Sequence, residues 1–520
     1  MHRFLILLPF CLLILHAQTI EKAAQTGYES ITTMDMKNHL SILASDSLEG
    51  RETSYPGQRK AAHYIASIFK KLNLEPLGDD GTYFQHFDVE VARVHPETKI
   101  VIEIGGMKKR YAWETDFISE GTRDTTLTGP AAFVGFTDTE LDSTAQVKLA
   151  GRVVFAFIGK KGYANDTTKA ATLRRLYSNR RDAGAIAALM IPDEEGPATF
   201  QQAQQIRRDY GIDKGIMQMK SNMPQVKPSN IHFLVSRVLA EEVLRSSGKS
   251  LKQLRDEALQ NQKFTPIFID DAIVTIHAKA IREIKQTENV LGILPGSDPV
   301  LKAQVVAFTA HYDHLGKTQD GVIYHGADDD GSGTTAVLEL AEAFAKNPIK
   351  PKRSLLFMTV TGEEKGLFGS QYYVNNPIIP LDQTIADLNM DMIGRMDILH
   401  EAHKDTNYIY VIGSDKISLE LDSLLQAANT ESEQLTLDYK YNDEQDPERF
   451  YYRSDHYNFA KNGVPIVFFF DGIHADYHKP TDTVDKILFE RMGKMCRMIY
   501  DLGWKLGNFN RLLIKKSIQE

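Results

Sequence analysis

The fold is decided at residues 305–316, which read VVAFTAHYDHLG. The first six residues, Val305 to Ala310, have the length and composition of a buried strand. Three residues of types that bind metal ions follow at once, namely His311, Asp313 and His314. The stretch predicts a strand whose carboxyl end delivers polar side chains to a functional site.

The surrounding sequence repeats this pattern of short apolar strands separated by helices. Four further strands are predicted, at Ser354 to Val360, Ile385 to Met390, Tyr408 to Ile412 and Val464 to Phe470. Between strands, Thr334 to Ala345 and Leu419 to Ala428 carry apolar residues at helical spacing. Apolar strands that alternate with helices are typical of an α/β sheet covered on both faces.

Polar residues lie at the ends of four of these strands. Glu363 and Glu364 follow one strand, Asp391 follows another, and His478 stands in the loop after the last. The loop Gly326 to Gly333 adds three consecutive aspartates. So many carboxylates and histidines on one rim would repel and desolvate one another unless a cation stood between them. The pattern predicts a metal site, and ligands without thiolate suit zinc, cobalt or manganese.

Composition and charge argue against other classes of protein. The chain has 520 residues, of which 25% are charged, and 60 Lys and Arg against 69 Asp and Glu give a net charge of −9. At roughly 150 residues per domain, two to four globular domains are expected. The acidic balance and the absence of a long basic block argue against nucleic-acid binding. Since Cys11 and Cys496 are the only cysteines, disulfide and thiol chemistry are poor candidates.

The N-terminus has the anatomy of a secretory signal peptide. Arg3 precedes the apolar run Phe4 to Leu15, and Ala17 suits a cleavage boundary. The run is too short to span a bilayer, and no later apolar run approaches about 18 residues. We therefore expect a signal peptide at residues 1–17, no membrane span in the mature chain, and export to the periplasm or the external medium.

The region before the predicted sheet contains two helices and an inserted module. Ile31 to Leu48 and Gly57 to Leu74 are predicted helices, and Lys99 to Ile104 is a strand candidate. Residues 116–265, with strands punctuated by glycines, are predicted to be a β-rich insert. Within it, Ile212 to Lys227 has weak periodicity and is predicted to be a loop.

Three other motifs resemble known catalytic or binding motifs but lack the residues or the spacing that these require. Ser454-Asp455-His456 cannot be a serine triad, because adjacent residues do not converge. The histidines of His400-Glu401-Ala402-His403 are three residues apart, whereas zinc helices need four. Gly316-Lys317-Thr318 imitates the end of a phosphate loop but lacks its first glycine.

A further set of motifs follows one order along residues 286–490. They are His311-x-Asp313, Gly326-Ala327-Asp328-Asp329, Gly362-Glu363-Glu364-x-Gly366-Leu367-x-Gly369-Ser370, Asn389-Met390-Asp391, Ser454-Asp455-His456 and Tyr477-His478-x-x-x-Asp482-Thr483. Together they resemble the M28 family of co-catalytic zinc aminopeptidases. The stretch Leu43 to Arg51 also resembles exported members of that family, and residues 116–265 are similar to the protease-associated (PA) domain often inserted in them.

This resemblance implies a fold and a domain order. The fold is a three-layer zinc-peptidase fold, with a mixed central β-sheet flanked by helices, plus the β-rich PA-like domain. The chain then divides into the signal peptide, an N-terminal part of the peptidase domain at 18–115, the insert at 116–265 and the main peptidase part at 266–520.

The resemblance also implies two zinc ions, for which cobalt or manganese can substitute. Asp329 would bridge the two ions. His311 and Asp391 would complete one site, and Glu364 and His478 the other.

Three residues receive roles beside the metal ligands. Asp313 would hold the ring of His311, and Glu363 would be the general base that takes a proton from water. Tyr477 can donate a hydrogen bond to the developing oxyanion, although a buried core tyrosine is an equally open interpretation.

The choice of Asp329 among the three aspartates rests on its lying four residues before Gly333, as in the family. Asp328 is the alternative. The family often has a cis peptide bond after the bridging aspartate, which here is Asp329–Asp330.

We therefore expect an exported di-zinc aminopeptidase that releases N-terminal residues from peptides by attack of metal-activated water. A carboxypeptidase is the first alternative, because Tyr451, Tyr452 and Arg453 can bind a substrate carboxylate. A glutaminyl cyclase with one zinc, or a non-catalytic peptide-binding or receptor protein, is disfavoured because all five ligand positions are retained. The side-chain preference, the role of the insert and the oligomeric state stay open.

Overall fold

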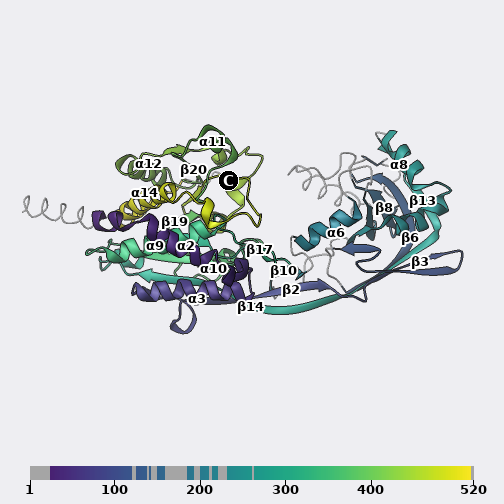
Figure 1. The fold of residues 1–520 in the computed structure, drawn as a ribbon, viewed down its shortest axis with the longest axis horizontal. Helices are drawn as coiled ribbons and strands as arrows, with labels where there is room; N and C mark the ends of the chain where they lie inside the picture. The colour runs from purple at the N-terminus through teal and green to yellow at the C-terminus, as the bar shows by residue number, and fades with distance from the viewer. Residues whose placement is uncertain are drawn as a thin grey trace, which may run out of the picture. The chain divides into compact units, whose positions relative to one another are not determined.

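In a computed structural model of the chain, the described residues are 24–119, 124–137, 140–141, 149–158, 184–192, 199–209, 214–220, 231–260 and 263–516. The chain forms two compact units (Figure 1). Unit 1 comprises Met1–Asp88 and Lys285–Glu520, and unit 2 comprises Val89–Ile284. The expected signal peptide at 1–17 lies outside the described residues.

Unit 1 is built on a mixed sheet. Its strands follow the order β2 (Phe84–Val94), β14 (Ala280–Leu294), β18 (Ser354–Val360), β15 (Val305–His311), β19 (Thr384–Met390), β22 (Ile466–Phe470), β20 (Tyr408–Ile412) and β21 (Thr436–Asp438). The central strands β18, β15, β19 and β22 run parallel, whereas β14 and β20 pair antiparallel with β18 and β22. The predicted mixed α/β sheet is confirmed, with small shifts such as the start of β22 at Ile466 instead of Val464.

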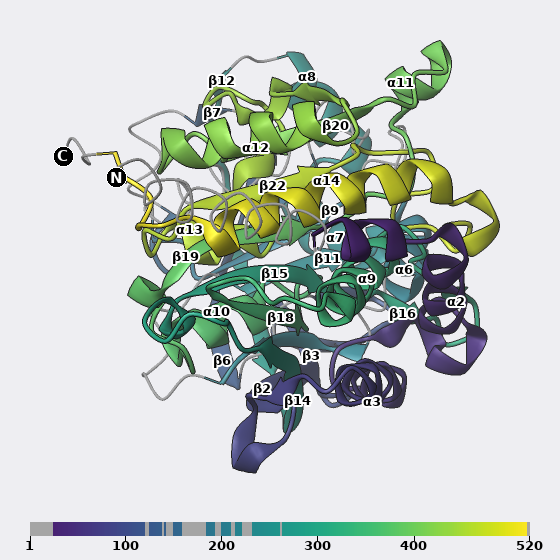
Figure 2. The same cartoon turned by 90° about the vertical axis from the view of Figure 1, so that its left-hand side faces the viewer.

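Helices cover both faces of this sheet because its central strands are apolar on both. In β15, Val306 and Phe308 are buried in one cluster, and Val305 and Ala307 in another. The first cluster includes residues of α2 (Thr33–Leu43), α3 (Pro56–Lys71), α9 (Gly331–Lys346), α12 (Leu419–Glu431) and α14 (Phe489–Asn508). The second includes residues of α10 (Phe368–Asn375) and α13 (His456–Ala460). Figure 2 shows α9 and α12 on either side of α14, and the two helical layers complete the expected three-layer fold.

Short elements fill the connections of unit 1. They are β1 (Glu75–Pro76), which pairs with β14, the pair β16 (Gly316–Lys317) and β17 (Ile323–Tyr324), and α11 (Ile398–His403). Within the described part of the chain, no helix is both long and apolar enough to cross a lipid bilayer.

Unit 2 has a sheet and a core of its own. The sheet order is β4 (Met107–Ala112), β3 (Lys99–Ile104), β13 (Ile267–Ala278), β6 (Thr125–Phe136), β8 (Val153–Phe157), β9 (Ala187–Ile191), β11 (Ile231–Val235) and β5 (Phe117–Ser119). The helices α6 (Phe200–Asp209), α7 (Arg237–Leu244) and α8 (Leu251–Gln260) accompany it, and β7 (Glu140–Leu141) pairs with β12 (Lys263–Phe264). Because β13 pairs with both β3 and β6, unit 2 begins before residue 116 and extends beyond residue 265.

One prediction in unit 2 is wrong. Within the expected loop Ile212 to Lys227, the structure has a strand, β10 (Ile216–Met219). It pairs antiparallel with β2, with Ile216 opposite Ala92 and Met219 opposite Val89. The partner strand is distant in sequence, so the weak local periodicity did not reveal the pairing.

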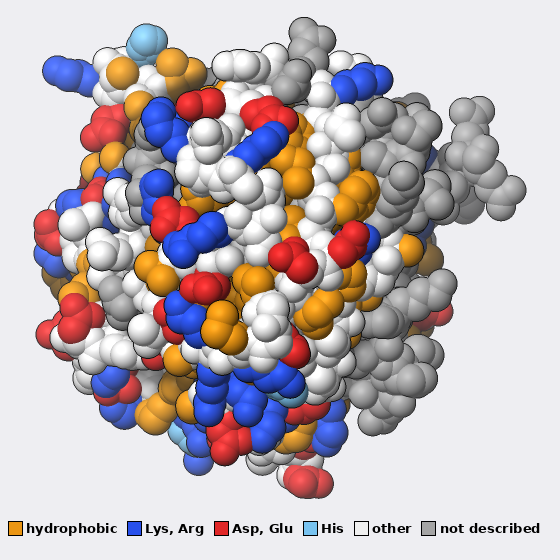
Figure 3. Space-filling model, turned by 90° about the vertical axis from the view of Figure 1, so that its right-hand side faces the viewer, with side chains coloured by type: hydrophobic (Ala, Val, Ile, Leu, Met, Phe, Trp, Pro, Cys, Tyr) orange, Lys and Arg blue, Asp and Glu red, His pale blue; other side chains and the backbone are white. Residues whose placement is uncertain are grey.

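Charges of both signs are interspersed on the face of unit 2 that Figure 3 shows. Ion pairs of this unit include Lys109 with Glu242 at 2.7 Å and Arg152 with Asp270 at 2.6 Å. Acidic and basic side chains of the unit therefore partly neutralise one another.

Candidate metal centre

The carboxyl ends of the four parallel strands bring the predicted ligands to one edge of the sheet of unit 1. His311 is the last residue of β15, and Asp391 directly follows β19. Glu364 lies in the loop between β18 and α10, and His478 lies in the loop after β22. Because neighbouring parallel strands end on the same side, these side chains meet although they are far apart in the sequence.

Asp329 comes from the loop before α9, and its neighbour fixes this loop in place. Asp330 is the N-cap of α9 and accepts a hydrogen bond from Gly333 N at 2.8 Å. The same carboxylate accepts hydrogen bonds from His311 N at 3.1 Å and Met392 N at 3.2 Å, so it ties the loop to the ends of β15 and β19. The Asp329–Asp330 peptide bond is cis, which confirms that prediction.

Asp328 and Asp482 lie behind Asp329. Asp328 Oδ1 accepts a hydrogen bond from Gly394 N at 2.7 Å, and its Oδ2 lies 3.3 Å from His474 Nε2. Asp482 Oδ2 accepts hydrogen bonds from Asp328 N at 3.0 Å and from Asp329 N at 3.2 Å. The structure therefore places Asp329, and not Asp328, beside the predicted ligands, and Asp482 holds its backbone.

Asp329 offers one oxygen to each of two groups of side chains. Its Oδ1 lies 3.3 Å from His311 Nε2, which is 3.5 Å from Asp391 Oδ1. Its Oδ2 lies 3.1 Å from His478 Nε2, which is 3.2 Å from Glu364 Oε2. Atoms that ligate one tetrahedral zinc ion lie about 3.3 Å from one another. Both groups therefore have the spacing of ligands that share an ion, with Asp329 common to the two.

The donor atoms fit cations because several have no other partner. His311 Nε2, Asp329 Oδ2 and Glu364 Oε1 are buried and without a hydrogen bond. A buried polar atom left unpaired costs about 1–3 kcal/mol. A cation in each group would satisfy these atoms and offset the repulsion between the carboxylates.

The charges of the site stabilise one another. Burial alone would lower the pKa of His478, but Glu364 and Asp329 outweigh it and raise this pKa to about 11. Burial opposes ionisation of Asp329, yet the neighbouring imidazole groups of His311 and His478 hold its pKa well below the usual value. Asp329 is thus ionised and attracts cations, and a bound metal ion would displace the protons of the histidines.

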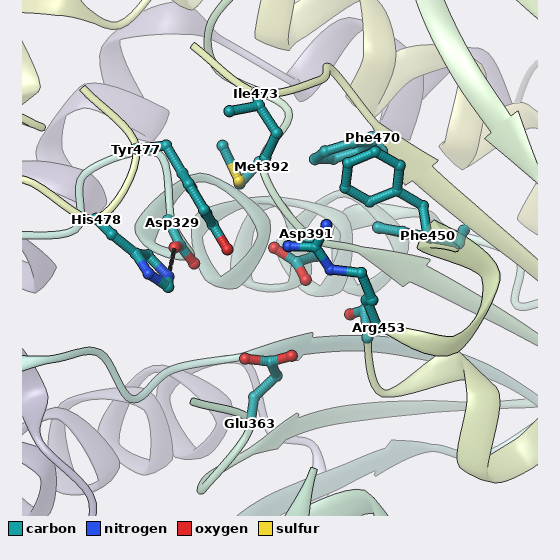
Figure 4. A pocket seen from close by; sticks show the side chains of 12 residues that line it. Asp329, Glu363, Asp391, Met392, Phe450, Arg453, Phe470, Ile473, Tyr477 and His478 are labelled. Atoms are coloured by element: carbon teal, nitrogen blue, oxygen red, sulfur yellow. Dashed lines mark ion pairs between the residues drawn. The ribbon is translucent and has the colours of Figure 1, made fainter. Parts of the chain in front are cut away.

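Glu363 stands beside the ligands with a different electrostatic environment. Its Oε2 lies 3.9 Å from His311 Nε2, and Figure 4 shows its carboxylate facing Asp329 and Asp391 across the pocket. Burial, reinforced by the charges of Asp391 and Glu364 and opposed by His311, raises its pKa well above the usual value. A carboxyl group that readily holds a proton next to metal ligands is suited to acid–base chemistry.

Asp313 contacts both His311 and Glu363. Its backbone carbonyl oxygen lies 3.1 Å from His311 Nδ1, and its carboxylate oxygen Oδ1 is 3.8 Å from that nitrogen. The carboxylate accepts hydrogen bonds from Thr53 Oγ1 at 2.7 Å and from Glu363 N at 3.2 Å. The ring of His311 is therefore nearer to the backbone of Asp313 than to its carboxylate, which instead orients the loop of Glu363.

Tyr477 lies over one ligand with its hydroxyl in the pocket (Figure 4). Its ring stacks on His478 with centroids 3.9 Å apart. Burial and the charges of Asp329 and Glu364 raise the pKa of Tyr477 well above its usual value. The phenol therefore stays protonated and is available as a hydrogen-bond donor.

A pocket opens over the predicted ligands. Beside Asp329, Glu363, Asp391 and His478, its wall contains five apolar side chains, Met392, Phe450, Phe468, Phe470 and Ile473. Arg453 also lines it, with its guanidinium 4.6 Å from the Phe450 ring and 3.9 Å from Glu448. The pocket thus combines an apolar wall, a cluster of carboxylates and one cation.

Two residues at this edge were given no role from the sequence. His314 Nδ1 lies 2.8 Å from Glu364 Oε1, and His314, Asp329 and Glu364 form a group of atoms close enough to share a metal ion. Arg51 is buried and donates to four backbone carbonyl groups, two of which, in Tyr312 and Gly326, belong to loops of the site. The signals were present, since His314 follows Asp313 directly and Arg51 ends the stretch that resembles exported M28 peptidases.

Part of the chain matches a known protein family. Residues 289–502 match the model of peptidase family M28. A relative named probable leucine aminopeptidase, from Trichophyton verrucosum, is 26% identical over 228 residues, which are 42% of this chain and 57% of the relative. The chain therefore spans little more than half the length of this curated relative.

Solved structures support the fold over nearly the whole chain. An aminopeptidase from Aneurinibacillus sp. strain AM-1 superposes with a TM-score of 0.57 at 18% identity, covering 95% of this chain and 98% of that one. BSAP, a zinc aminopeptidase from Bacillus subtilis, gives a TM-score of 0.52 at 18% identity, with coverage of 92% and 97%. At this identity the likeness establishes the fold alone. With the family match and the motifs at the sheet edge, it leads to one conclusion: residues 289–502 of this chain belong to peptidase family M28.

Proposed function

We propose that the chain is an exported zinc aminopeptidase that holds two zinc ions and releases N-terminal residues from peptides. The observation that carries the proposal is the position of Asp329, whose two oxygens face two separate groups of ligand atoms. His311 and Asp391 would hold one ion, and Glu364 and His478 the other. The family match and the names of the relatives support the class of reaction.

Two bound zinc ions would supply a polarised water molecule and an electrophile for the peptide carbonyl group. Glu363 takes a proton from that water and delivers it to the departing amine. Its raised pKa suits this role, because the group must hold the proton between the two transfers. Tyr477 donates a hydrogen bond to the carbonyl oxygen as negative charge develops there.

The pocket wall supports an apolar side chain at the N-terminus of the substrate. Phe450, Phe468 and Phe470 line it with Met392 and Ile473. Burial of an apolar side chain against them contributes about 1.5–3 kcal/mol. The acidic side of the pocket, formed by Asp329, Glu363 and Asp391, is suited to bind the free α-amino group of the peptide, which distinguishes an aminopeptidase from an endopeptidase.

Export and the nature of the insert belong to the same proposal. The apolar run Phe4 to Leu15 supports a signal peptide at 1–17. The separate β-sheet core of unit 2 supports an inserted PA-like domain, predicted at 116–265 between peptidase parts at 18–115 and 266–520, although the unit itself comprises Val89–Ile284. Fractionation of the source cells, with an antibody against the chain, tests export directly.

Hydrolysis of aminoacyl nitroanilides tests the proposed reaction. We expect leucyl nitroanilide to be cleaved, activity to vanish on dialysis against a chelator, and zinc to restore it. Activity that survives complete removal of metal would contradict the proposal.

Arg453 favours a carboxypeptidase as the second candidate function. Its guanidinium lines the pocket and can pair with a substrate carboxylate. Peptides with an acetylated N-terminus separate the two reactions. An aminopeptidase leaves them intact, whereas a carboxypeptidase still shortens them from the other end.

A further inference from the structure

His314 is the buried imidazole at the metal centre to which no role has been given. It lies three residues after His311, and its side chain is fully buried. Neither ring nitrogen has a hydrogen-bond partner among the described residues. A neutral imidazole needs one acceptor and one donor partner, so a buried ring with neither calls for another kind of partner.

The neighbours of His314 Nδ1 are oxygens of the metal centre. Glu364 Oε1 lies 2.8 Å away, and Asp329 Oδ2 lies 3.9 Å away. Both oxygens are also buried and without a hydrogen bond. Although His314 Nδ1 and Glu364 Oε1 are close, the N–H direction at Nδ1 does not point at this oxygen as a hydrogen bond requires. Such a pair is expected where the lone pairs of both atoms converge on a common cation.

The same two carboxylates face His478 from another side. His478 Nε2 lies 3.1 Å from Asp329 Oδ2 and 3.2 Å from Glu364 Oε2. The rings of His314 and His478 are 6.0 Å apart and nearly perpendicular. Three of the four distances from the two ring nitrogens to the carboxylate oxygens, 2.8, 3.1 and 3.2 Å, lie near the value of about 3.3 Å for tetrahedral zinc ligands. The fourth, from His314 Nδ1 to Asp329 Oδ2, is longer at 3.9 Å.

We propose that His314 is a further zinc ligand, which binds through Nδ1 the ion held by Glu364, Asp329 and His478. This inference deepens the proposed function and rests on it. The two sites then differ, because the ion at Glu364 has two imidazole ligands, whereas the ion at Asp391 has one. An additional imidazole favours zinc or cobalt over magnesium or manganese at the Glu364 site.

Cadmium NMR distinguishes a ligand from a side chain that only positions Glu364. The full chain is loaded with two equivalents of ¹¹³Cd, and its histidine rings are labelled with ¹⁵N. We expect one-bond ¹¹³Cd–¹⁵N coupling at three histidine nitrogens, of which two are Nε2 and one is Nδ1. The Nδ1 coupling marks His314, because His311 and His478 face the centre through Nε2.

Two variants identify the signal. In His314→Gln the Nδ1 coupling should disappear while both Nε2 couplings remain. In the matched control His63→Gln, which changes an exposed histidine on α3, all three should persist. The wild-type spectrum alone decides the matter if His314→Gln does not fold.

The outcomes separate this inference from the proposed function. Couplings at two Nε2 atoms only, in a chain that binds two metal ions and cleaves peptides, would overturn the role of His314 and leave the peptidase intact. If neither the wild-type chain nor any variant binds metal, both the role of His314 and the proposed function are overturned. A coupled Nδ1 supports the ligand role irrespective of the peptidase assay.

Discussion

Glu363 and Glu364 are adjacent in the sequence but face opposite electrostatic conditions. Burial raises the pKa of both, yet His478 and His314 more than offset it at Glu364, so this carboxylate stays ionised. At Glu363, the charges of Asp391 and Glu364 add to the effect of burial, and the pKa is raised. One carboxylate is therefore suited to bind a cation and its neighbour to carry a proton.

Substitution of Glu363 tests this division of roles. Glu363→Gln removes the proton acceptor and keeps the shape of the side chain, so kcat should fall by about 10²–10⁴-fold. Zinc content by plasma mass spectrometry should not change, because Glu363 belongs to neither ligand group. The exposed control Glu444→Gln should keep full activity, and wild-type kcat in Glu363→Gln would reject the assignment.

We expect Tyr477 to make a smaller contribution, one that is specific to the transition state. Tyr477→Phe removes the hydroxyl and keeps the ring that stacks on His478. We expect kcat to fall by about 10²-fold with little change in KM, because the hydrogen bond strengthens as charge develops. Steady-state kinetics check this, with Tyr372→Phe, on α10 and outside the pocket lining, as control. An unchanged kcat would assign Tyr477 a packing role.

At the scale of elements, one buried side chain connects the loops that carry the site. Arg51 Nη1 donates to the carbonyl oxygens of Leu43 and His325 at 2.6 and 2.7 Å. Its Nε and Nη2 donate to Tyr312 and Gly326, each at 2.8 Å. The planar guanidinium therefore binds the end of α2, the loop after β15 and the loop before α9 to one another.

Lysine cannot reproduce this arrangement, although it keeps the charge. In Arg51→Lys at least one carbonyl group is left unpaired, at a cost of about 1–3 kcal/mol. We expect the melting temperature to fall by several degrees in scanning calorimetry of the zinc-loaded protein, whereas the exposed control Arg59→Lys should not change it. Equal melting temperatures for the two variants would show that the four hydrogen bonds contribute little.

A buried carboxyl group in β19 makes stability depend on pH. Asp387 is fully buried and accepts one hydrogen bond, from Thr309 Oγ1 at 2.7 Å. Burial raises its pKa to about 8. The folded state therefore holds a proton that the unfolded chain releases near pH 4, and the stability that this group contributes at low pH is lost as pH rises to about 8.

Asp387→Asn should remove this dependence, because the amide is neutral at every pH. Relative to wild type, the free energy of unfolding of the variant should rise by about 1.4 kcal/mol per pH unit between pH 5 and 7. Denaturant titrations at several pH values measure it, with the exposed Asp382→Asn as control. A difference that stays constant with pH would contradict the assignment.

Elements were easier to predict than the contacts between them. The strands β15, β18 and β22 are mainly apolar runs, so local composition was sufficient, and the chain order of the family's motifs pointed to the ligand set. The burial of Arg51 and Asp387 was not predictable, since it depends on packing against distant segments. His314 was visible as a strand-end residue, but only the positions of Glu364 and Asp329 in space suggest a role for it.

At the scale of the whole molecule, all proposed ligands belong to unit 1. The boundaries of unit 2 were harder to predict than the core of unit 1. Its neighbouring strands β3 and β13 lie far apart in the sequence, and only their pairing shows that they share a sheet. A local change of composition marked the middle of the insert but not its limits.

Removal of zinc should therefore destabilise unit 1 more than unit 2. Binding to the folded state alone adds about 2.7 kcal/mol when free zinc exceeds Kd a hundredfold. In calorimetry we expect a chelator to lower the transition of unit 1 by several degrees and to leave that of unit 2 in place. Limited proteolysis assigns the transitions, and equal shifts of both would mean that zinc acts elsewhere.

Anomalous scattering at the zinc absorption edge tests the central claim most directly. In crystals grown with zinc, we predict two peaks about 3.5–4 Å apart, one against His311 and Asp391 and one against His478 and Glu364, with Asp329 in contact with both. A single peak, or peaks away from these side chains, would contradict the two-metal site.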